Sequence, residues 1–330
     1  MLRTPRVESS VTPRSLTARS ALTRQSRRTA SAARPAPLDS TVVTVLASLL
    51  RTARPKQWTK NLLVVAAPLA AGSLWEPAVL GPTILAFVAF CLLSSAVYAV
   101  NDVADRVADR AHPTKRMRPI ASGTLSVRAA LVGALALAAV GLGLAALASW
   151  SLAVLLAAYV VLMLAYAFRL KHEPVIDISI VTAGFLMRAV AGGLAADLRI
   201  SQWFLLVAGF GALFIVSGKR YSELHTLGNE VGTRRALIRY TATYLRFVWG
   251  VAAGATVMSY SLWAFEVAPA EGIPWHTISI APFVVGVLRY AVDIDDGTAA
   301  EPEDIVLEDR VLQGLGVLWI GALVLGVLDV

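Results

Sequence analysis

The chain has 330 residues, of which 57% are hydrophobic and 16% are charged, and its mean hydropathy is +0.65. Because an ordinary soluble domain has about 25% charged residues, this composition excludes a soluble globular protein, a disordered chain and a disulfide-stabilised scaffold. The single cysteine, Cys91, cannot form an internal disulfide.

Basic residues are concentrated at the N-terminus. Residues 1–60 carry 12 Lys and Arg against two acidic residues, whereas residues 61–330 carry 18 basic and 20 acidic residues. The net charge of +8 and the pI near 9.9 therefore reflect the N-terminal segment and do not indicate a nucleic-acid-binding protein. Residues 1–40, rich in Arg, Ser, Thr, Ala and Pro, predict a disordered cytoplasmic tail. The same composition leaves a mitochondrial transit peptide open.

Long apolar segments alternate with short polar breaks from residue 41 onward. A membrane-spanning helix needs about 20 apolar residues, and nine segments approach that length: 61–80, 82–100, 129–148, 150–168, 175–195, 203–218, 242–264, 276–292 and 311–328. Residues 41–53 precede them as a short amphipathic helix, which we expect at the membrane surface. The sequence therefore predicts an all-α polytopic membrane domain over residues 41–330 with nine transmembrane helices.

The positions of Lys and Arg also predict the orientation, because cytoplasmic loops carry an excess of these residues. With the N-terminus in the cytoplasm, nearly every Lys and Arg falls on the cytoplasmic side, in the tail and in the loops 101–128, 169–174, 219–241 and 293–310. We therefore expect a multi-pass protein of the inner (plasma) membrane whose N-terminus and active site both face the cytoplasm.

An acidic run follows the second predicted span, with Asn101, Asp102, Asp105 and Asp109 in the pattern NDxxDxxxD. If the helix continues, these side chains share one stripe, where neighbouring carboxylates repel each other. An all-oxygen ligand set suits Mg²⁺, which typically joins one or two carboxylates to substrate phosphates. The run therefore predicts a magnesium site. The alternative is a solvated helix end whose acidic residues pair with Arg106 and Arg110.

Basic residues follow the acidic run at Lys115, Arg116 and Arg118. Their position favours binding of a phosphate beside the metal, although an ordinary basic cytoplasmic loop has the same composition. Arg188 lies within the fifth predicted span and shares a helix face with Asp177. An ionised arginine inside a span needs a polar cavity or a partner. We expect it to reach a substrate phosphate at the cavity floor, and the alternative is a structural arginine.

Further candidate phosphate ligands are Lys171, His172, Lys219 and Arg220 at the cytoplasmic ends of spans, and Lys56 and Lys60 before the first span. The last two lie one helical turn apart and suit a phosphate or lipid headgroups equally well.

Several of these segments resemble the UbiA-type superfamily of intramembrane prenyltransferases. They are RPKQWTKNLLVVAAPLA at 54–70, NDVADRVADRAHPTKRMRPIASG at 101–123, LKHEPVIDISIV at 170–181 and GKRYSEL at 218–224. The resemblance covers residues 51–328 and is most specific to the superfamily's phosphoribosyltransferase branch. It implies a UbiA-like helical bundle with a cytoplasm-facing cavity.

One departure from the superfamily pattern concerns the substrate. Typical members carry a second Asp-rich motif that helps to hold a prenyl diphosphate, whereas here Asp177 stands alone, with Val181 in place of a second acid. The resemblance implies that the donor is instead phosphoribosyl pyrophosphate. Its 5-phosphoribosyl group would pass to decaprenyl (polyprenyl) phosphate for cell-wall arabinan precursor synthesis, with release of pyrophosphate.

In this reaction Mg²⁺ at Asn101, Asp105 and Asp109 would neutralise the leaving pyrophosphate. Asp102 would serve as a further ligand or orient one. Lys115, Arg116 and Arg118 would bind the ribose 5-phosphate or the pyrophosphate, and Lys171, Arg188, Lys219 and Arg220 the remaining phosphates.

Two other functions remain open at this stage. One is an aromatic or haem polyprenyltransferase of the same superfamily. The other is a transporter, which the few polar residues of the outer loops disfavour. The sequence leaves a homo-oligomer open.

Overall fold

The computed structural model describes residues 38–227, 239–269 and 271–328, and every regular element in these ranges is a helix. The predicted tail at 1–40 lies outside the described residues except for 38–40, which begin the first helix. Residues 228–238 of the predicted 219–241 loop also lie outside them. Residues 42–330 form one compact unit, and the fold below is that of this unit.

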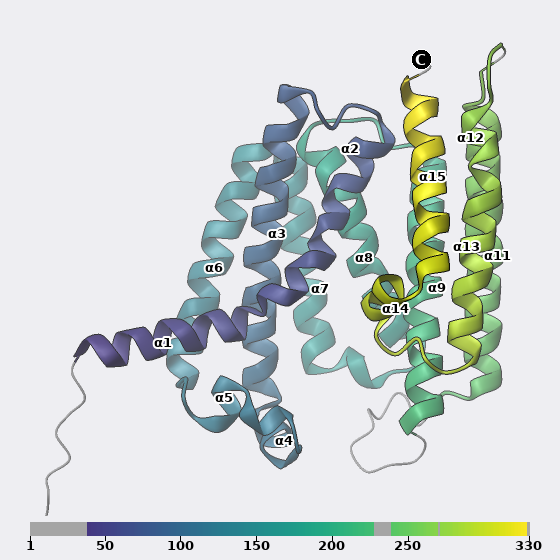
Figure 1. The fold of residues 1–330 in the computed structure, drawn as a ribbon. Coiled ribbons are helices and arrows are strands. Elements are labelled where there is room, and N and C mark those ends of the chain that lie inside the picture. The colour runs from purple at the N-terminus through teal and green to yellow at the C-terminus, as the bar shows by residue number, and fades with distance from the viewer. Residues whose placement is uncertain (1–37, 228–238, 270, 329–330) are drawn as a thin grey trace, which may run out of the picture. The chain divides into compact units, whose positions relative to one another are not determined.

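The described part of the chain contains eight helical segments that are long and apolar enough to cross a membrane. They are α3 (Pro77–Ala104), α6 (Val127–Ala148), α7 (Trp150–Phe168), α8 (Ile176–Ala195), α9 (Gln202–Leu227), α11 (Ala242–Glu266), the pair α12 (Trp275–Ile278) and α13 (Ile280–Asp295), and α15 (Arg310–Leu328). Figure 1 shows them side by side in two groups, with α3, α6, α7 and α8 in one and α9, α11, α13 and α15 in the other. The second to ninth predicted spans correspond to these segments.

Side-chain caps fix several of these helix starts. The hydroxyl oxygens of Ser126, Ser149 and Thr241 accept hydrogen bonds from backbone N–H groups three residues later, at the first turns of α6, α7 and α11. Each bond satisfies one of the backbone donors that a helix start leaves without a partner. The outer faces remain apolar and exposed, as at Leu135 and Leu318, which is the pattern of helices that contact lipid.

The first predicted span, residues 61–80, takes a different form. After α1 (Leu38–Ala53), the chain forms the 3-10 helix η1 (Pro55–Val65) and the short α2 (Ala66–Ala70), and α3 begins only at Pro77. The prediction of one long α-helix over residues 61–80 is therefore wrong. Because a 3-10 helix rises about 2.0 Å per residue, η1 and α2 together extend about 30 Å, which matches the hydrocarbon core of a bilayer. The ninth crossing stays a prediction.

A glycine explains how this segment packs against α8. A Cβ atom at Gly192 would overlap the carbonyl oxygen of Val64 in η1 and contact the ring of Pro68 at 3.1 Å. Glycine at this position lets the backbones of η1 and α8 approach closely, as small residues do between membrane helices.

Among the described residues, two large apolar cores and two smaller ones hold the unit together, and the large ones divide mainly between the two groups of helices. One gathers buried residues of α3, α6, α7 and α8, including Phe90, Leu93 and Leu156. The other gathers buried residues of α9, α11 and α13, including Phe214, Leu245 and Ile294. Short elements connect the long helices: α4 (Arg106–Ala111), η2 (Lys115–Met117), α5 (Pro119–Ser122), η3 (Leu170–His172) and α14 (Pro302–Glu308). Figure 1 shows α4 and α5 at the end of the bundle where α3 finishes.

Candidate metal and phosphate site

The acidic run lies on a break between two helices. Helix α3 ends at Ala104, Asp105 has φ −86° and ψ 2°, and α4 begins at Arg106. The prediction that the acidic side chains form one stripe on a continuous helix is therefore wrong. Because the chain turns here, Asp102 and Asp109 are buried, whereas the side chain of Asp105 is 31% exposed.

The two buried carboxylates share one arginine. Arg118, at the N-terminus of α5, places Nη1 3.1 Å from Asp102 Oδ1 and 2.8 Å from Asp109 Oδ2. Arg54, between α1 and η1, places Nη2 2.5 Å from the same oxygen of Asp102. Each buried acid thus has a cationic partner, which compensates the cost of burying its charge.

The exposed acid, Asp105, has its own partners. Lys171 of η3 places Nζ 2.6 Å from Asp105 Oδ1, and Asn101 donates from Nδ2 to Asp105 Oδ2 at 3.1 Å. The alternative pairing that the sequence left open does not hold for Arg110, because its Nε donates to the carbonyl of Ala121. The structure therefore brings Asn101, Asp105 and Lys171 together at one point.

These residues suit a magnesium ion in part. Among the described residues, no three His, Cys, Asp or Glu side chains converge closely enough to form a metal cage by themselves. The partly exposed carboxylate of Asp105 lies beside the amide of Asn101, and Asp109 follows one turn later. Mg²⁺ commonly binds one or two carboxylates together with substrate phosphates and water, so this donor set fits an ion that is completed by a substrate.

The remaining predicted phosphate ligands near this turn are exposed. Lys115 and Arg116 lie on η2, His172 lies on η3, and Lys56 lies on η1. Lys60 is half-buried on the same element, η1. Their roles stay predictions.

Asp177 is committed to protein partners. It is 1% exposed in the first turn of α8, where Arg220 of α9 places Nε 2.8 Å from Oδ2 and the Tyr166 hydroxyl donates to Oδ1 at 2.7 Å. Arg220 also contacts Glu223 at 2.7 Å. The predicted phosphate ligand Arg220 therefore sits in a buried ion pair that joins the two groups of helices.

Arg188 is likewise enclosed by protein. Its guanidinium donates to Asn61 Oδ1 at 2.8 Å, to the Tyr159 hydroxyl at 2.9 Å and to the Gly184 carbonyl at 2.8 Å. It also lies over the rings of Phe90, Tyr159 and Phe185. The geometry favours the structural alternative for this residue, as an anchor between η1, α7 and α8.

Lys219 contacts the segment before α14. Its Nζ lies 2.5 Å from the Ala300 carbonyl oxygen and 3.3 Å from Glu301 Oε2. Its predicted role toward a substrate phosphate stays a prediction.

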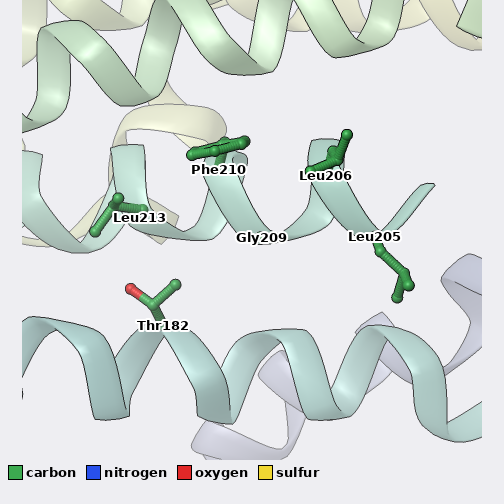
Figure 2. Close-up of a pocket in the computed structure, with 6 residues that line it drawn as sticks. All are labelled: Thr182, Leu205, Leu206, Gly209, Phe210 and Leu213. Atoms are coloured by element: carbon green, nitrogen blue, oxygen red, sulfur yellow. The ribbon is translucent and has the colours of Figure 1, made fainter. Parts of the chain in front are cut away.

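An apolar pocket of about 300 Å³ lies between α8 and α9 (Figure 2). Five of its lining residues come from α9, and Thr182 faces them from α8. It is lined by Thr182, Leu205, Leu206, Gly209, Phe210 and Leu213. None of these side chains is charged, so this pocket is not the predicted phosphate site. The cytoplasm-facing cavity stays a prediction.

The sequence analysis did not identify Arg54 and Asn61, which contact candidate residues from distant positions in the chain. Arg54 pairs with Asp102 across 48 positions, and Asn61 holds Arg188 across 127. A buried charge needs a partner, so an acidic or basic residue in a span predicts that some other residue pairs with it. The sequence does not say which one it is.

Comparisons with known proteins agree with this architecture. Residues 41–306 match the family model of the UbiA prenyltransferase family. The chain is 48% identical over 299 residues to a decaprenyl-phosphate phosphoribosyltransferase of Mycolicibacterium smegmatis, covering 84% of this chain and 92% of the relative. It is also 48% identical over 282 residues to the protein of that name from Mycobacterium tuberculosis, covering 84% and 93%.

Solved structures share the fold. A UbiA homologue from Archaeoglobus fulgidus bound to GPP and Mg²⁺ aligns with a TM-score of 0.63 and 20% identity, over 86% of this chain and all of that one. A digeranylgeranylglyceryl phosphate synthase aligns with a TM-score of 0.65 and 16% identity, over 86% and 99%. The helical bundle, the NDxxDxxxD turn and the family match over most of the chain place this protein in the UbiA prenyltransferase family.

Proposed function

We propose that this protein transfers the 5-phosphoribosyl group of phosphoribosyl pyrophosphate to decaprenyl phosphate, or a similar polyprenyl phosphate, and releases pyrophosphate. The observation that carries the proposal is the 48% identity, over nearly their whole length, to proteins named decaprenyl-phosphate phosphoribosyltransferase. The product would serve cell-wall arabinan precursor synthesis.

The surroundings of Asp177 support this donor over a prenyl diphosphate. A diphosphate held by two metal sites needs a second free carboxylate cluster opposite the first. Asp177 is instead neutralised by Arg220 and hydrogen-bonded by Tyr166. In the part of the chain that the structure describes, we infer a single metal-binding turn, at Asn101, Asp105 and Asp109, which suits a donor whose diphosphate is held at one site.

The residues of this turn have separable roles. Mg²⁺, when bound at Asn101, Asp105 and Asp109, supplies the positive charge that makes pyrophosphate a better leaving group. Lys171 and Arg118 lie directly beside these acids and are placed to bind phosphate oxygens. Exposed Lys115 and Arg116 extend the basic surface. The lipid phosphate is already an anion at neutral pH, so its attack on C1 of the ribose needs no general base.

The orientation follows from the same residues. Lys and Arg are concentrated in the segments beside the metal-binding turn, as at Lys115, Arg116 and Arg118, and cytoplasmic loops carry an excess of these residues, so the turn belongs on the cytoplasmic side of an inner (plasma) membrane, with the N-terminus on that side. The lipid phosphate reaches the turn from the adjoining leaflet.

A labelled-substrate assay tests the proposal. Purified protein in nanodiscs receives ribose-labelled phosphoribosyl pyrophosphate, decaprenyl phosphate and Mg²⁺, and label should enter the lipid fraction. Asp105→Asn should remove this transfer, whereas Glu271→Gln, in an exposed loop far along the chain, should not. Label that never enters lipid, together with transfer of a prenyl group from prenyl diphosphate to an aromatic ring, would reject the proposal.

A further inference from the structure

Asp102 differs from the other acids of the turn in its partners. Asp102 and Asp109 are both buried, but two arginines from different parts of the chain contact one oxygen of Asp102, Oδ1, whereas Arg118 contacts Asp109 at Oδ2. A carboxylate oxygen that already accepts from two arginines is poorly placed to bind a metal as well, whereas Asp105, three residues later, is 31% exposed. Asp102 is therefore better suited to fix the geometry of the turn than to bind an ion itself.

Arg54 reaches Asp102 from an unusual backbone position. It has φ 52° and ψ 62°, the left-handed region, and it immediately precedes Pro55. This conformation is unfavourable for a residue other than glycine and persists only where surrounding contacts determine it. Those contacts are the ion pair with Asp102 at 2.5 Å and the face of the Tyr98 ring, 5.0 Å from the guanidinium carbon.

The ion pairs continue from Asp102 to the metal-binding turn. Arg118 contacts Asp102 at 3.1 Å and Asp109 at 2.8 Å. The contacts thus run from Arg54 to Asp102, then to Arg118 and to Asp109. They join the start of η1, the last turn of α3, α4 and the N-terminus of α5. Because α3 and α4 meet at Asp105, this series of pairs sets the angle between the two helices.

We propose that Arg54 is a positioning residue: through Asp102 and Arg118, it sets how Asp105 and Asp109 stand relative to each other for metal binding. The inference rests on the proposed function only in taking these two acids as metal ligands. In the described contacts, Arg54 itself pairs with neither Asp105 nor Asp109. A lysine would keep the charge but lose the planar group that both pairs with a carboxylate and stacks on a ring.

Binding of Mn²⁺, used alone as a paramagnetic probe, gives a readout that is independent of turnover. Arg54→Gln should weaken Mn²⁺ binding, measured by EPR titration of the full chain in nanodiscs, at least tenfold. Arg51→Gln is the matched control, since Arg51 is an exposed arginine three residues earlier on α1. It should bind Mn²⁺ as the parent protein does.

A double-mutant cycle separates positioning from general damage. If Arg54 acts through Asp102, then Arg54→Gln combined with Asp102→Asn should bind Mn²⁺ no more weakly than Asp102→Asn alone. If Arg54→Gln fails to fold, as judged by size-exclusion chromatography, Arg54→Lys should fold and show an intermediate loss.

Four results would overturn the inference. Three of them are Mn²⁺ affinity in Arg54→Gln equal to that of the parent, additive losses in the double variant, and absence of Mn²⁺ binding by the parent. A rise in KM for phosphoribosyl pyrophosphate with unchanged Mn²⁺ affinity would also overturn it, because Arg54 would then bind substrate. If the parent lacks phosphoribosyl transfer but the Mn²⁺ pattern holds, the proposed function fails and the positioning role stands.

Discussion

Replacing Arg188 with leucine distinguishes a structural arginine from a phosphate ligand. Arg188 is 7% exposed, and the hydrogen-bond partners of its guanidinium are Asn61, Tyr159 and the Gly184 carbonyl, all uncharged. Arg188→Leu removes the donors to Asn61 and Tyr159 and leaves both acceptors buried. The Gly184 carbonyl lies four residues earlier in the same helix and keeps its backbone partner.

The expected loss of stability follows from these two orphaned groups. Polar interactions between membrane helices average about 0.6 kcal/mol and reach about 1.7 kcal/mol each, so two of them amount to about 1.2–3.4 kcal/mol. Removing a charge from an apolar interior offsets part of this, which places the expected value near the lower end. Since about 1.4 kcal/mol corresponds to a factor of ten, the unfolding equilibrium should shift by roughly tenfold.

Thermal unfolding in nanodiscs, followed together with steady-state kinetics, provides the measurement. Arg188→Leu should lower the unfolding temperature and leave KM for phosphoribosyl pyrophosphate within twofold of the parent value. Adding Asn61→Leu removes one orphaned acceptor, so the double variant should lose less than the sum of the two single variants. Unchanged stability with a tenfold rise in KM would refute this reasoning and make Arg188 a substrate ligand.

Three further outcomes test the site and the packing around it. Asp105→Asn should lower phosphoribosyl transfer about 100-fold or more, and EDTA should stop transfer by the parent until Mg²⁺ is restored, both measured as label in lipid. Tyr240→Phe removes the hydroxyl that accepts the Val175 N–H at 2.6 Å; because Val175 is exposed and water can replace this partner, the fold should lose only about 0.5–1.5 kcal/mol in thermal unfolding. Gly192→Ala places a methyl group against the Val64 carbonyl; it should cost about 3 kcal/mol, seen as poor recovery of monodisperse protein.

The sequence predicted the long helices well because their signal is local. Eight apolar segments near the required length became helices, although α3 begins five residues earlier than predicted and α9 ends nine residues later. Ser126, Ser149 and Thr241 cap three of them as short polar residues at helix starts do. The long α-helix expected over the first span was wrong, because the helix type of this segment depends on tertiary contacts, and whether the segment crosses the membrane stays a prediction. Hydropathy does not distinguish an α-helix from a 3-10 helix held by Gly192 and Arg188 of α8.

The sequence proposed the residues of the candidate site but not the pairs that they form, and the roles of these residues stay predictions. The acids of the NDxxDxxxD run and several nearby cations were identified from local spacing. Their partners lie far away in sequence: Lys171 meets Asp105 across 66 positions, and Arg220 meets Asp177 across 43. Helical periodicity carries no information about such contacts. Helical periodicity also predicted that α3 continues past Asp105. In the structure α3 ends at Ala104, and the ion pairs of Asp102 and Asp109 lie on either side of the break.

The pairings resolve a physical difficulty in the sequence. Carboxylates that lie on one stripe without counter-charges repel each other, and from the sequence alone we predicted that a bound metal supplies the compensating charge. In the structure Asp102, Asp105 and Asp109 are balanced by Arg54, Arg118 and Lys171. A cation that binds Asp105 must therefore compete with Lys171. Mg²⁺ bound together with a phosphorylated substrate would meet both needs, because Asp105 would hold the metal and Lys171 would bind a phosphate oxygen instead.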